Sequence, residues 1–147
     1  MNTRTVATVL QCSGNGRAFF QHKPSGSQWR IGAVGCALWT GVLVSDVFKL
    51  FGGVKDGLNF LTTTGGETIP AGIDFDQVAV QRSVLLDKGL KDCMLVWPMN
   101  GAPISLAHGG PLRLIVPGYY GVNNVKWVKK LAATPAESAA EIQQTGY

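Results

Sequence analysis

TRTVATVLQCSGNGR, residues 3–17, combines a run rich in valine and threonine with an abrupt turn signal. The β-branched side chains favour an extended strand over residues 3–11. The Asn15-Gly16 pair that follows is typical of a tight turn. A single thiol, that of Cys12, stands at the junction between strand and turn. The segment therefore predicts a strand that ends at a reactive side chain, and the rest of the chain must supply a sheet for it.

The composition is that of one folded domain. Of the 147 residues, 46% are apolar and 15% are charged, which excludes a disordered chain and favours an α/β or α+β fold. No apolar run reaches the ~18–20 residues that cross a bilayer, and the first residues do not have the pattern of a signal peptide. We therefore expect no membrane partner. The net charge of +4 is modest and scattered, which favours an anionic ligand over a nucleic-acid partner.

Local patterns predict an α+β domain that is dominated by strands. The Asn100-Gly101 pair predicts a tight hairpin, Ser45 is expected to cap one short helix, and Thr134 is expected to cap another through a Thr-Pro-x-Glu capping box. A further short helix is expected over residues 83–90. Further strands are expected over residues 58–64, 93–97, 111–117 and 123–131. Because the chain starts within a predicted strand and ends directly after a predicted helix, residues 1–147 are expected to form one domain that is truncated at both ends.

The three cysteines are widely spaced and include no C-x-x-C pair. This pattern argues against a disulfide framework and against structural zinc. Cys36 and Cys93 lie in apolar runs and are expected to be small core residues. Cys12 has glycine-rich polar neighbours and is the candidate for chemistry.

Two glycines and a cation follow Cys12. Gly14 and Gly16 allow positive φ and let successive N–H groups face one side, which suits an anion. Arg17 adds a fork of five donors. In such an electropositive place the thiolate is favoured, and a thiolate is a nucleophile or a soft-metal ligand. The alternative is a plain hairpin turn with its cysteine in the core.

A second group of polar residues lies within AHGGPLRLIVPGYYGVNNVKW, residues 107–127. His108, Lys126 and Arg113, the last on the polar side of an apolar strand, could converge with glycine-exposed amides on a phosphate-bearing ligand. The alternative is a glycine-rich hairpin with two solvated cations. The G-x-S-x-G, G-x-x-x-x-G-K-[ST] and H-E-x-x-H patterns are absent, which excludes the enzyme classes that depend on them.

In their order and separation, these stretches resemble the sulfite oxidase family of molybdenum enzymes. The resemblance rests on VATVLQCSGNGR, WRIGAVGCALWTGVLVSDVF, MNGAPISLAHGGPLRLIVPGYYGVNNVKW and QQTGY, and it is greatest for bacterial sulfite dehydrogenases. It implies a strand-rich α+β molybdopterin domain that holds molybdenum with one molybdopterin. It also implies oxidation of sulfite to sulfate, with electrons passed to a haem acceptor such as cytochrome c.

The resemblance also implies roles for single residues. Cys12 would be the only protein ligand of molybdenum, Arg17 would attract the anionic substrate, and Tyr147 would be the active-site tyrosine. Trp29 matches a tryptophan of the substrate pocket. The residues implied to bind the cofactor are His108, Arg113, Asn124, Val125 and Lys126. Among these, the two cations would neutralise phosphate charge, and the main chain of the asparagine and valine would orient the pterin.

The chain also departs from the family pattern. It lacks the upstream segment with a Phe-Phe-x-Arg-Asn-His-like motif and the downstream dimerisation domain. Gly16 replaces the first arginine of an Arg-Arg pair, and Glu67 matches an acidic pterin contact only loosely. Two alternatives therefore stay open: a related molybdopterin oxidoreductase for another sulfur or oxo substrate, and an inactive fragment or anion-binding module. The whole protein is expected to be periplasmic and to form a homodimer or a heterodimer.

Overall fold

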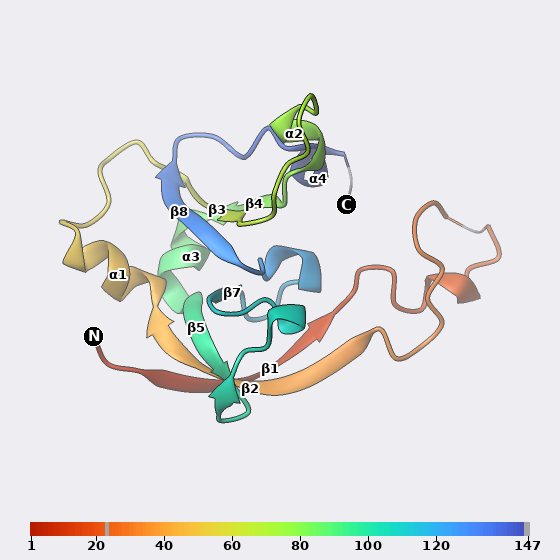
Figure 1. Cartoon of the computed structure of the whole chain (residues 1–147), viewed down its shortest axis with the longest axis horizontal. Helices are drawn as coiled ribbons and strands as arrows, with labels where there is room; N and C mark the ends of the chain where they lie inside the picture. Colours follow the sequence, from red (N-terminus) through yellow and green to blue (C-terminus); the bar gives the residue numbers. More distant parts are fainter. Residues whose placement is uncertain (23, 146–147) are drawn as a thin grey trace.

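The structure, a computed structural model, describes residues 1–22 and 24–145, so Tyr147 lies outside the described residues. The described residues form two antiparallel sheets with short helices around them (Figure 1). The larger sheet has the order β1-β2-β5-β6, with β7 also paired to β5; its strands are β1 Arg4–Gln11, β2 Val34–Leu43, β5 Met94–Met99, β6 Ala102–Pro103 and β7 Arg113–Ile115. The smaller sheet has the order β4-β3-β8; its strands are β3 Phe60–Gly65, β4 Gln81–Leu85 and β8 Val128–Thr134.

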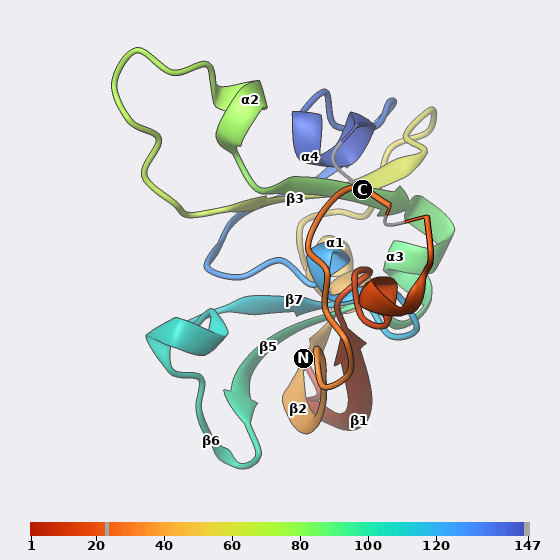
Figure 2. The same cartoon turned by 90° about the vertical axis from the view of Figure 1, so that its right-hand side faces the viewer.

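The described residues also form four short α-helices and three 3-10 turns, which connect the strands or, for the last helix, follow them. The helices are α1 Val44–Leu50, α2 Phe75–Val78, α3 Leu86–Asp92 and α4 Glu141–Gln144. The 3-10 turns are η1 Arg17–Phe19, η2 Leu106–His108 and η3 Gly121–Asn123. The side view in Figure 2 shows β3 above β7 and β5, with the β1–β2 hairpin below them. This arrangement confirms the predicted strand-rich α+β class.

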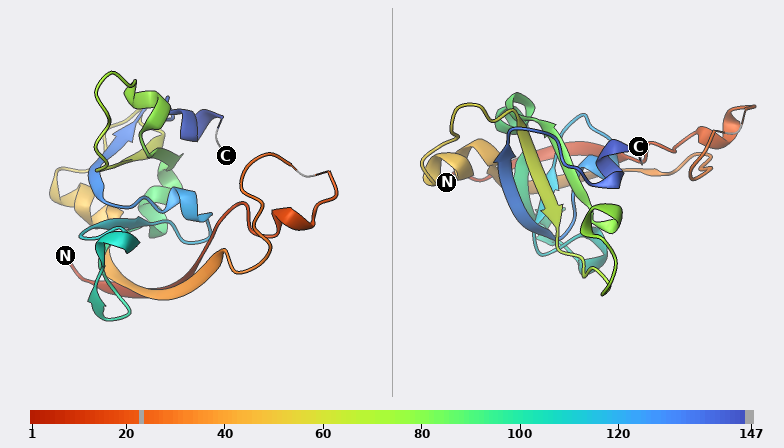
Figure 3. Two further views of the ribbon diagram at one scale, coloured as in Figure 1. Left: turned by 45° about the vertical axis from the view of Figure 1, so that its right-hand side comes forward. Right: turned by 90° about the horizontal axis from the view of Figure 1, so that it is seen from above.

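The first predicted strand is present as β1, which pairs with β2 along its whole length, from Arg4 opposite Gly41 to Gln11 opposite Val34. The far end of this hairpin, with the residues that connect its strands, extends away from the body of the domain (Figures 1 and 3). Cys36 is exposed on this hairpin, so its predicted place in the core is wrong. Its strand partner is Val9, which is 50% exposed, because no other described element covers this part of the hairpin.

The main core lies between the two sheets. Leu61 of the smaller sheet packs with Leu114, Val116 and Val125 from β7 and the segments that follow it. Cys93 is completely buried in this cluster, as its apolar run predicts. A backbone hydrogen bond of 2.9 Å from Leu114 N to Val125 O joins β7 to the segment after η3. The core therefore fixes the stretch that carries the second predicted group of polar residues.

The predicted helix starts at Ser45 and Thr134 are wrong in opposite directions. Helix α1 begins at Val44, directly after the last paired residue of β2, Leu43, so Ser45 lies inside the helix and is not its N-cap. Thr134 is still in β8, opposite Phe60, and α4 begins only at Glu141.

Two other predicted boundaries also shift. Residues 83–85 pair with β3 as part of β4, so the predicted helix over residues 83–90 begins at Leu86. The predicted strand over residues 123–131 begins only at Val128, because residues 121–123 form η3. Among the described residues, none of the helices has the length and apolar character needed to span a membrane.

Candidate functional site

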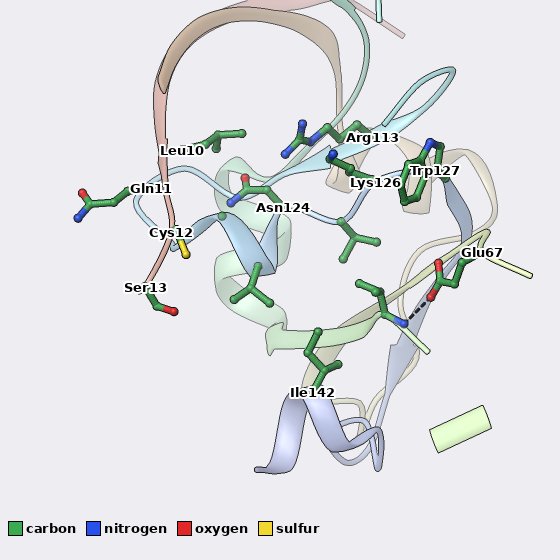
Figure 4. Close-up of a pocket in the computed structure, with 14 residues that line it drawn as sticks. Leu10, Gln11, Cys12, Ser13, Glu67, Arg113, Asn124, Lys126, Trp127 and Ile142 are labelled. Atoms are coloured by element: carbon green, nitrogen blue, oxygen red, sulfur yellow. Dashed lines mark hydrogen bonds between the residues drawn. The ribbon is translucent and has the colours of Figure 1, made fainter. Parts of the chain in front are cut away.

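A cavity of about 540 Å³ lies where β1 ends, between this strand and the segments that follow β7. It brings together five of the residues predicted to carry chemistry: Cys12, Arg113, Asn124, Val125 and Lys126. Figure 4 shows Cys12 and Ser13 on one side of the cavity and the two cations on the other. The remaining lining residues are Leu10, Gln11, Glu67, Val80, Gly121, Val122, Trp127 and Ile142.

Strand β1 positions the thiol of Cys12. The N–H of Cys12 donates to Ala33 O at 2.9 Å, which prolongs the pairing of the hairpin by one residue. The chain then turns, and the N–H of Gly14 points back to the Cys12 sulfur at 3.4 Å. The sulfur is directed from the strand toward the cavity (Figure 4). A half-buried thiol that accepts a backbone N–H and faces a cavity is placed to act as a ligand or a nucleophile.

Arg113 is a buried cation, only 7% exposed, although its strand pattern predicts a polar face. Its Nη1 donates to His108 O at 2.7 Å, and its guanidinium lies 5.0 Å from the centre of the Trp39 ring. Its Nε is buried without a partner among the described residues, and no described carboxylate forms an ion pair with it. Burial lowers the pKa of Arg113 to about 10. The guanidinium has no counter-ion among the described residues, so an anion bound in the cavity would neutralise its charge.

Lys126 lies next to Arg113 at the same cavity. Burial and, to a smaller extent, the positive charge of Arg113 lower the pKa of its ammonium group. The Lys126 Nζ donates to Ala107 O at 2.6 Å and lies 5.3 Å from the centre of the Trp127 ring. The Trp127 indole in turn donates to Leu106 O at 2.9 Å. Both side chains therefore donate hydrogen bonds to carbonyl groups of η2, and Arg113 donates to a third carbonyl of the same turn.

Residue 109, which follows η2, must be glycine for the Lys126 side chain to occupy its observed position. Gly109 has a φ of +98°, and a Cβ at this position would come within 2.5 Å of Lys126 Cγ. We expect Gly109→Ala to lower the free energy of unfolding by about 2 kcal/mol, from backbone strain and from this clash. Gly118 is the matched control, since its φ is +82° but a Cβ there would meet no heavy atom within 4 Å. Urea unfolding of both variants measures the difference; equal losses would mean that the close approach to Lys126 contributes nothing.

Asn124 shapes the wall of the cavity from within the protein. Its side chain is almost completely buried; Oδ1 accepts from Val116 N at 2.7 Å and Nδ2 donates to Tyr120 O at 2.9 Å. These bonds fold residues 117–123 into a closed loop. The Asn124 side chain is therefore held by this loop, and the main-chain role that the resemblance implies for Asn124 and Val125 stays a prediction.

Glu67 lines the cavity, although its position in the sequence matches the acidic pterin contact of the family only loosely. One of its carboxylate oxygens, Oε1, accepts from Val80 N (Figure 4), and the other, Oε2, is buried without a partner among the described residues. Ser13 Oγ is a third buried polar atom without a partner at this cavity, after Arg113 Nε. Buried polar atoms normally have partners. Their concentration here fits a polar, anionic ligand with both acceptors and donors.

Arg17, Trp29 and His108 do not line this cavity in the structure. Arg17 lies in η1, where its Nη1 donates to Ser25 O at 2.7 Å, and Trp29 is 52% exposed. His108 is exposed, with Nδ1 at 2.7 Å from Ser105 Oγ; it lines a smaller cavity of about 200 Å³ that shares Arg113 with the first. The predicted roles of these residues and of Tyr147 stay predictions. Trp127 and Ile142 also line the cavity and were not predicted as site residues. The Lys-Trp pair of the family motif could have indicated Trp127, whereas no sequence pattern indicated Ile142.

Fold and cavity together define a class: a strand-rich domain with a cavity that two cations line and that a cysteine sulfur faces. Residues 1–142 match the family described as the oxidoreductase molybdopterin binding domain. The chain belongs to this family, and its cofactor is molybdenum held by molybdopterin. The donors and unpartnered atoms of the cavity fit such a group, which is anionic and rich in hydrogen-bonding atoms.

Known proteins with similar sequences include sulfite oxidases and nitrate reductases. The chain is 31% identical to mitochondrial sulfite oxidase from Drosophila melanogaster and 33% identical to sulfite oxidase from Gallus gallus. Both alignments cover 97% of this chain, but only 25% and 31% of the respective relatives. It is also 34% identical to an NAD(P)H nitrate reductase from Hordeum vulgare, over 88% of this chain and 15% of that protein.

A solved structure shares the fold. The crystal structure of the sulfane dehydrogenase SoxCD from Paracoccus pantotrophus matches with a TM-score of 0.77 and 26% identity, over 97% of this chain and 34% of the matched chain. The chain is thus a molybdopterin oxidoreductase domain of sulfite oxidase type that spans about a quarter to a third of these sulfur-oxidising relatives.

Proposed function

We propose that this chain is the molybdopterin domain of an enzyme that oxidises sulfite to sulfate and passes the electrons to a haem acceptor such as cytochrome c. The observation that carries the proposal is the Cys12 sulfur at a cavity whose opposite wall holds Arg113 and Lys126. The sulfite oxidases among the relatives support the substrate. A periplasmic location is part of the same proposal and rests on the resemblance to bacterial sulfite dehydrogenases.

Each cavity residue has a task in this proposal. Cys12 would bind molybdenum, since a thiolate is a soft, charge-donating ligand. Arg113 and Lys126 would hold the phosphate of the pterin, which supplies the counter-charge that both cations lack. Ser13 would donate, and Glu67 would accept, hydrogen bonds at the cavity wall. When bound, the cofactor supplies a two-electron redox centre, which matches the conversion of sulfite and water to sulfate, two protons and two electrons.

Substrate attraction depends on groups beyond the cavity described here. Arg17 would attract the sulfite dianion, although in this structure its Nη1 donates to Ser25 O in its own loop. Tyr147 would hydrogen-bond to the substrate.

Metal analysis combined with a sulfite-dependent ferricyanide assay tests the proposal. The chain is produced in a bacterium that makes molybdopterin, and molybdenum and pterin are measured per chain. Molybdenum near one per chain with sulfite turnover supports the proposal. Metal without sulfite turnover would favour another substrate, and absence of metal and pterin would favour an inactive module.

The second candidate is a related oxidoreductase that acts on another sulfur or oxo compound. The nitrate reductase and sulfane dehydrogenase among the matches favour this candidate. The same loaded chain, supplied with reduced dye and nitrate, separates the two: dye oxidation with nitrate but no ferricyanide reduction with sulfite would overturn the sulfite proposal.

A further inference from the structure

Arg82 is a buried cation of β4 that is not part of the cavity lining. It is 9% exposed, and its side chain leaves the smaller sheet toward two separate segments. Its Nε and Nη2 donate to Asn123 Oδ1 at 3.2 and 3.1 Å. Its Nη1 donates to the main-chain oxygen of Ile142. One guanidinium thus holds η3 and α4 at the same time.

Both of these segments form walls of the cavity. Asn123 is the last residue of η3, and Asn124, which follows it directly, lines the cavity together with Lys126. Ile142 lies in α4 and contributes its side chain to the same cavity (Figure 4). The segments lie about twenty residues apart in the sequence, and no strand pairing joins them. A change in the position of Arg82 would therefore move two cavity walls together.

The neighbours of Arg82 on β4, Gln81 and Ser83, also hold the C-terminal segment. Ser83 N donates to Gln143 Oε1 at 3.0 Å, and Ser83 Oγ accepts from Ser138 N at 2.9 Å. Gln81 Oε1 accepts from Ser138 Oγ at 2.6 Å. None of these three hydrogen bonds reaches η3. Part of the docking of α4 is thus made by residues other than Arg82, so it can be separated by substitution from the coupling of α4 to η3.

We propose that Arg82 is a positioning residue that couples α4 to η3 and thereby sets the shape of the cofactor cavity. The proposal rests on the proposed function in taking this cavity as the cofactor site. Arginine suits the role because its planar fork presents donors in several directions at fixed angles. A lysine offers one nitrogen on a flexible stem and would not hold both acceptors in this geometry.

Hydrogen exchange of the chain without added cofactor tests the coupling directly. We expect Arg82→Lys to increase exchange in two peptides, one that covers residues 117–127 and one that covers residues 138–145. Gln143→Ala is the matched control, since it removes a bond of α4 to β4 and leaves Asn123 in place; it should affect only the second peptide. Asn123→Ala cuts the coupling from the other end and should affect both. Effects of Arg82→Lys and Asn123→Ala that are confined to one peptide each would overturn the proposal.

Cofactor retention is the second readout. After expression in a host that makes molybdopterin, we expect Arg82→Lys to retain at least about 10-fold less pterin than Gln143→Ala, as for other residues that orient a binding site from behind. Equal retention in the two variants would overturn the role of Arg82 at the site. If the unsubstituted chain holds no pterin, the proposed function fails, whereas the exchange experiment still decides whether Arg82 couples the two segments.

Discussion

Replacing Cys12 by serine is expected to lower sulfite-dependent turnover of the loaded chain by at least about 100-fold and to change its metal spectrum. Residues that merely orient a metal ligand already contribute 10–100-fold, and Cys12 is placed as the ligand itself. Its sulfur faces the cavity and accepts the N–H of Gly14. Serine fits the same space but offers a harder oxygen that keeps its proton near neutral pH, so it donates less charge to a metal.

The other two cysteines provide the controls for this experiment. Cys36 lies exposed on the β1–β2 hairpin, so Cys36→Ser should leave the spectrum and the turnover unchanged. Cys93 is buried, and burial, with a smaller contribution from Asp92, raises the pKa of its thiol to about 12. It lies in the core and does not line the cavity, so we do not expect Cys93 to bind the cofactor. Molybdenum content, the electron paramagnetic resonance signal and turnover are measured for each variant. A Cys12→Ser protein with the spectrum of the unsubstituted chain would contradict the assignment.

The sequence alone predicted the parts of the fold that local chemistry decides. The β-branched run before Cys12 forms β1, and the Asn100-Gly101 pair turns β5 into β6, with positive φ at both residues. Helix starts were predicted less well. Ser45 and Thr134 have the right side chains for caps, but α1 already begins at Val44, before Ser45, and pairing with β3 holds Thr134 extended. At Thr134, long-range sheet pairing outweighed local capping.

The candidate site was predicted in its residue types but not in its environment. Cys12, Arg113 and Lys126 were identified from their motifs, and the structure places all three at one cavity. The burial of Arg113 was not foreseen, since alternation along a strand predicts one polar face. Leu114 of β7 packs into the main core with Leu61, whereas Ile115, which shares a face with Arg113, packs into a second cluster with Trp39, so both faces of the strand are covered. Glu67 also reaches the cavity from a distant loop, which no local pattern could indicate.

The unpaired charge of Arg113 links function to stability. Burial lowers its pKa to about 10, which corresponds to a penalty of about 3 kcal/mol for keeping the charged form in the folded, empty chain. The hydrogen bond to His108 O and the contact with the Trp39 ring offset part of it. An anion in the cavity would remove the rest. The chain without cofactor is thus less stable than its packing alone would allow, and binding an anionic group restores the difference.

Arg113→Met is therefore expected to stabilise the chain without cofactor by about 2 kcal/mol while lowering its pterin content by about 100-fold. Methionine fills similar space, keeps contact with the Trp39 ring and needs no counter-ion. The carbonyl of His108 loses its donor, but this residue is exposed and water can replace the bond. The pKa of Lys126 should also rise toward its ordinary value, since the charge of Arg113 contributes to lowering it.

The pH dependence distinguishes relief of buried charge from a general packing gain. The pKa of Arg113 is lower in the folded chain than in the unfolded chain, so above about pH 10 the unfolded chain binds more protons. The penalty is therefore complete below pH 10 and is lost as the pH rises through this value. Urea unfolding at pH 8 and at pH 10.5 should show the advantage of Arg113→Met shrinking at the higher pH. An advantage that stays constant would mean that methionine stabilises by packing alone, and a less stable variant at pH 8 would show that the hydrogen bond and the Trp39 contact already compensate the charge.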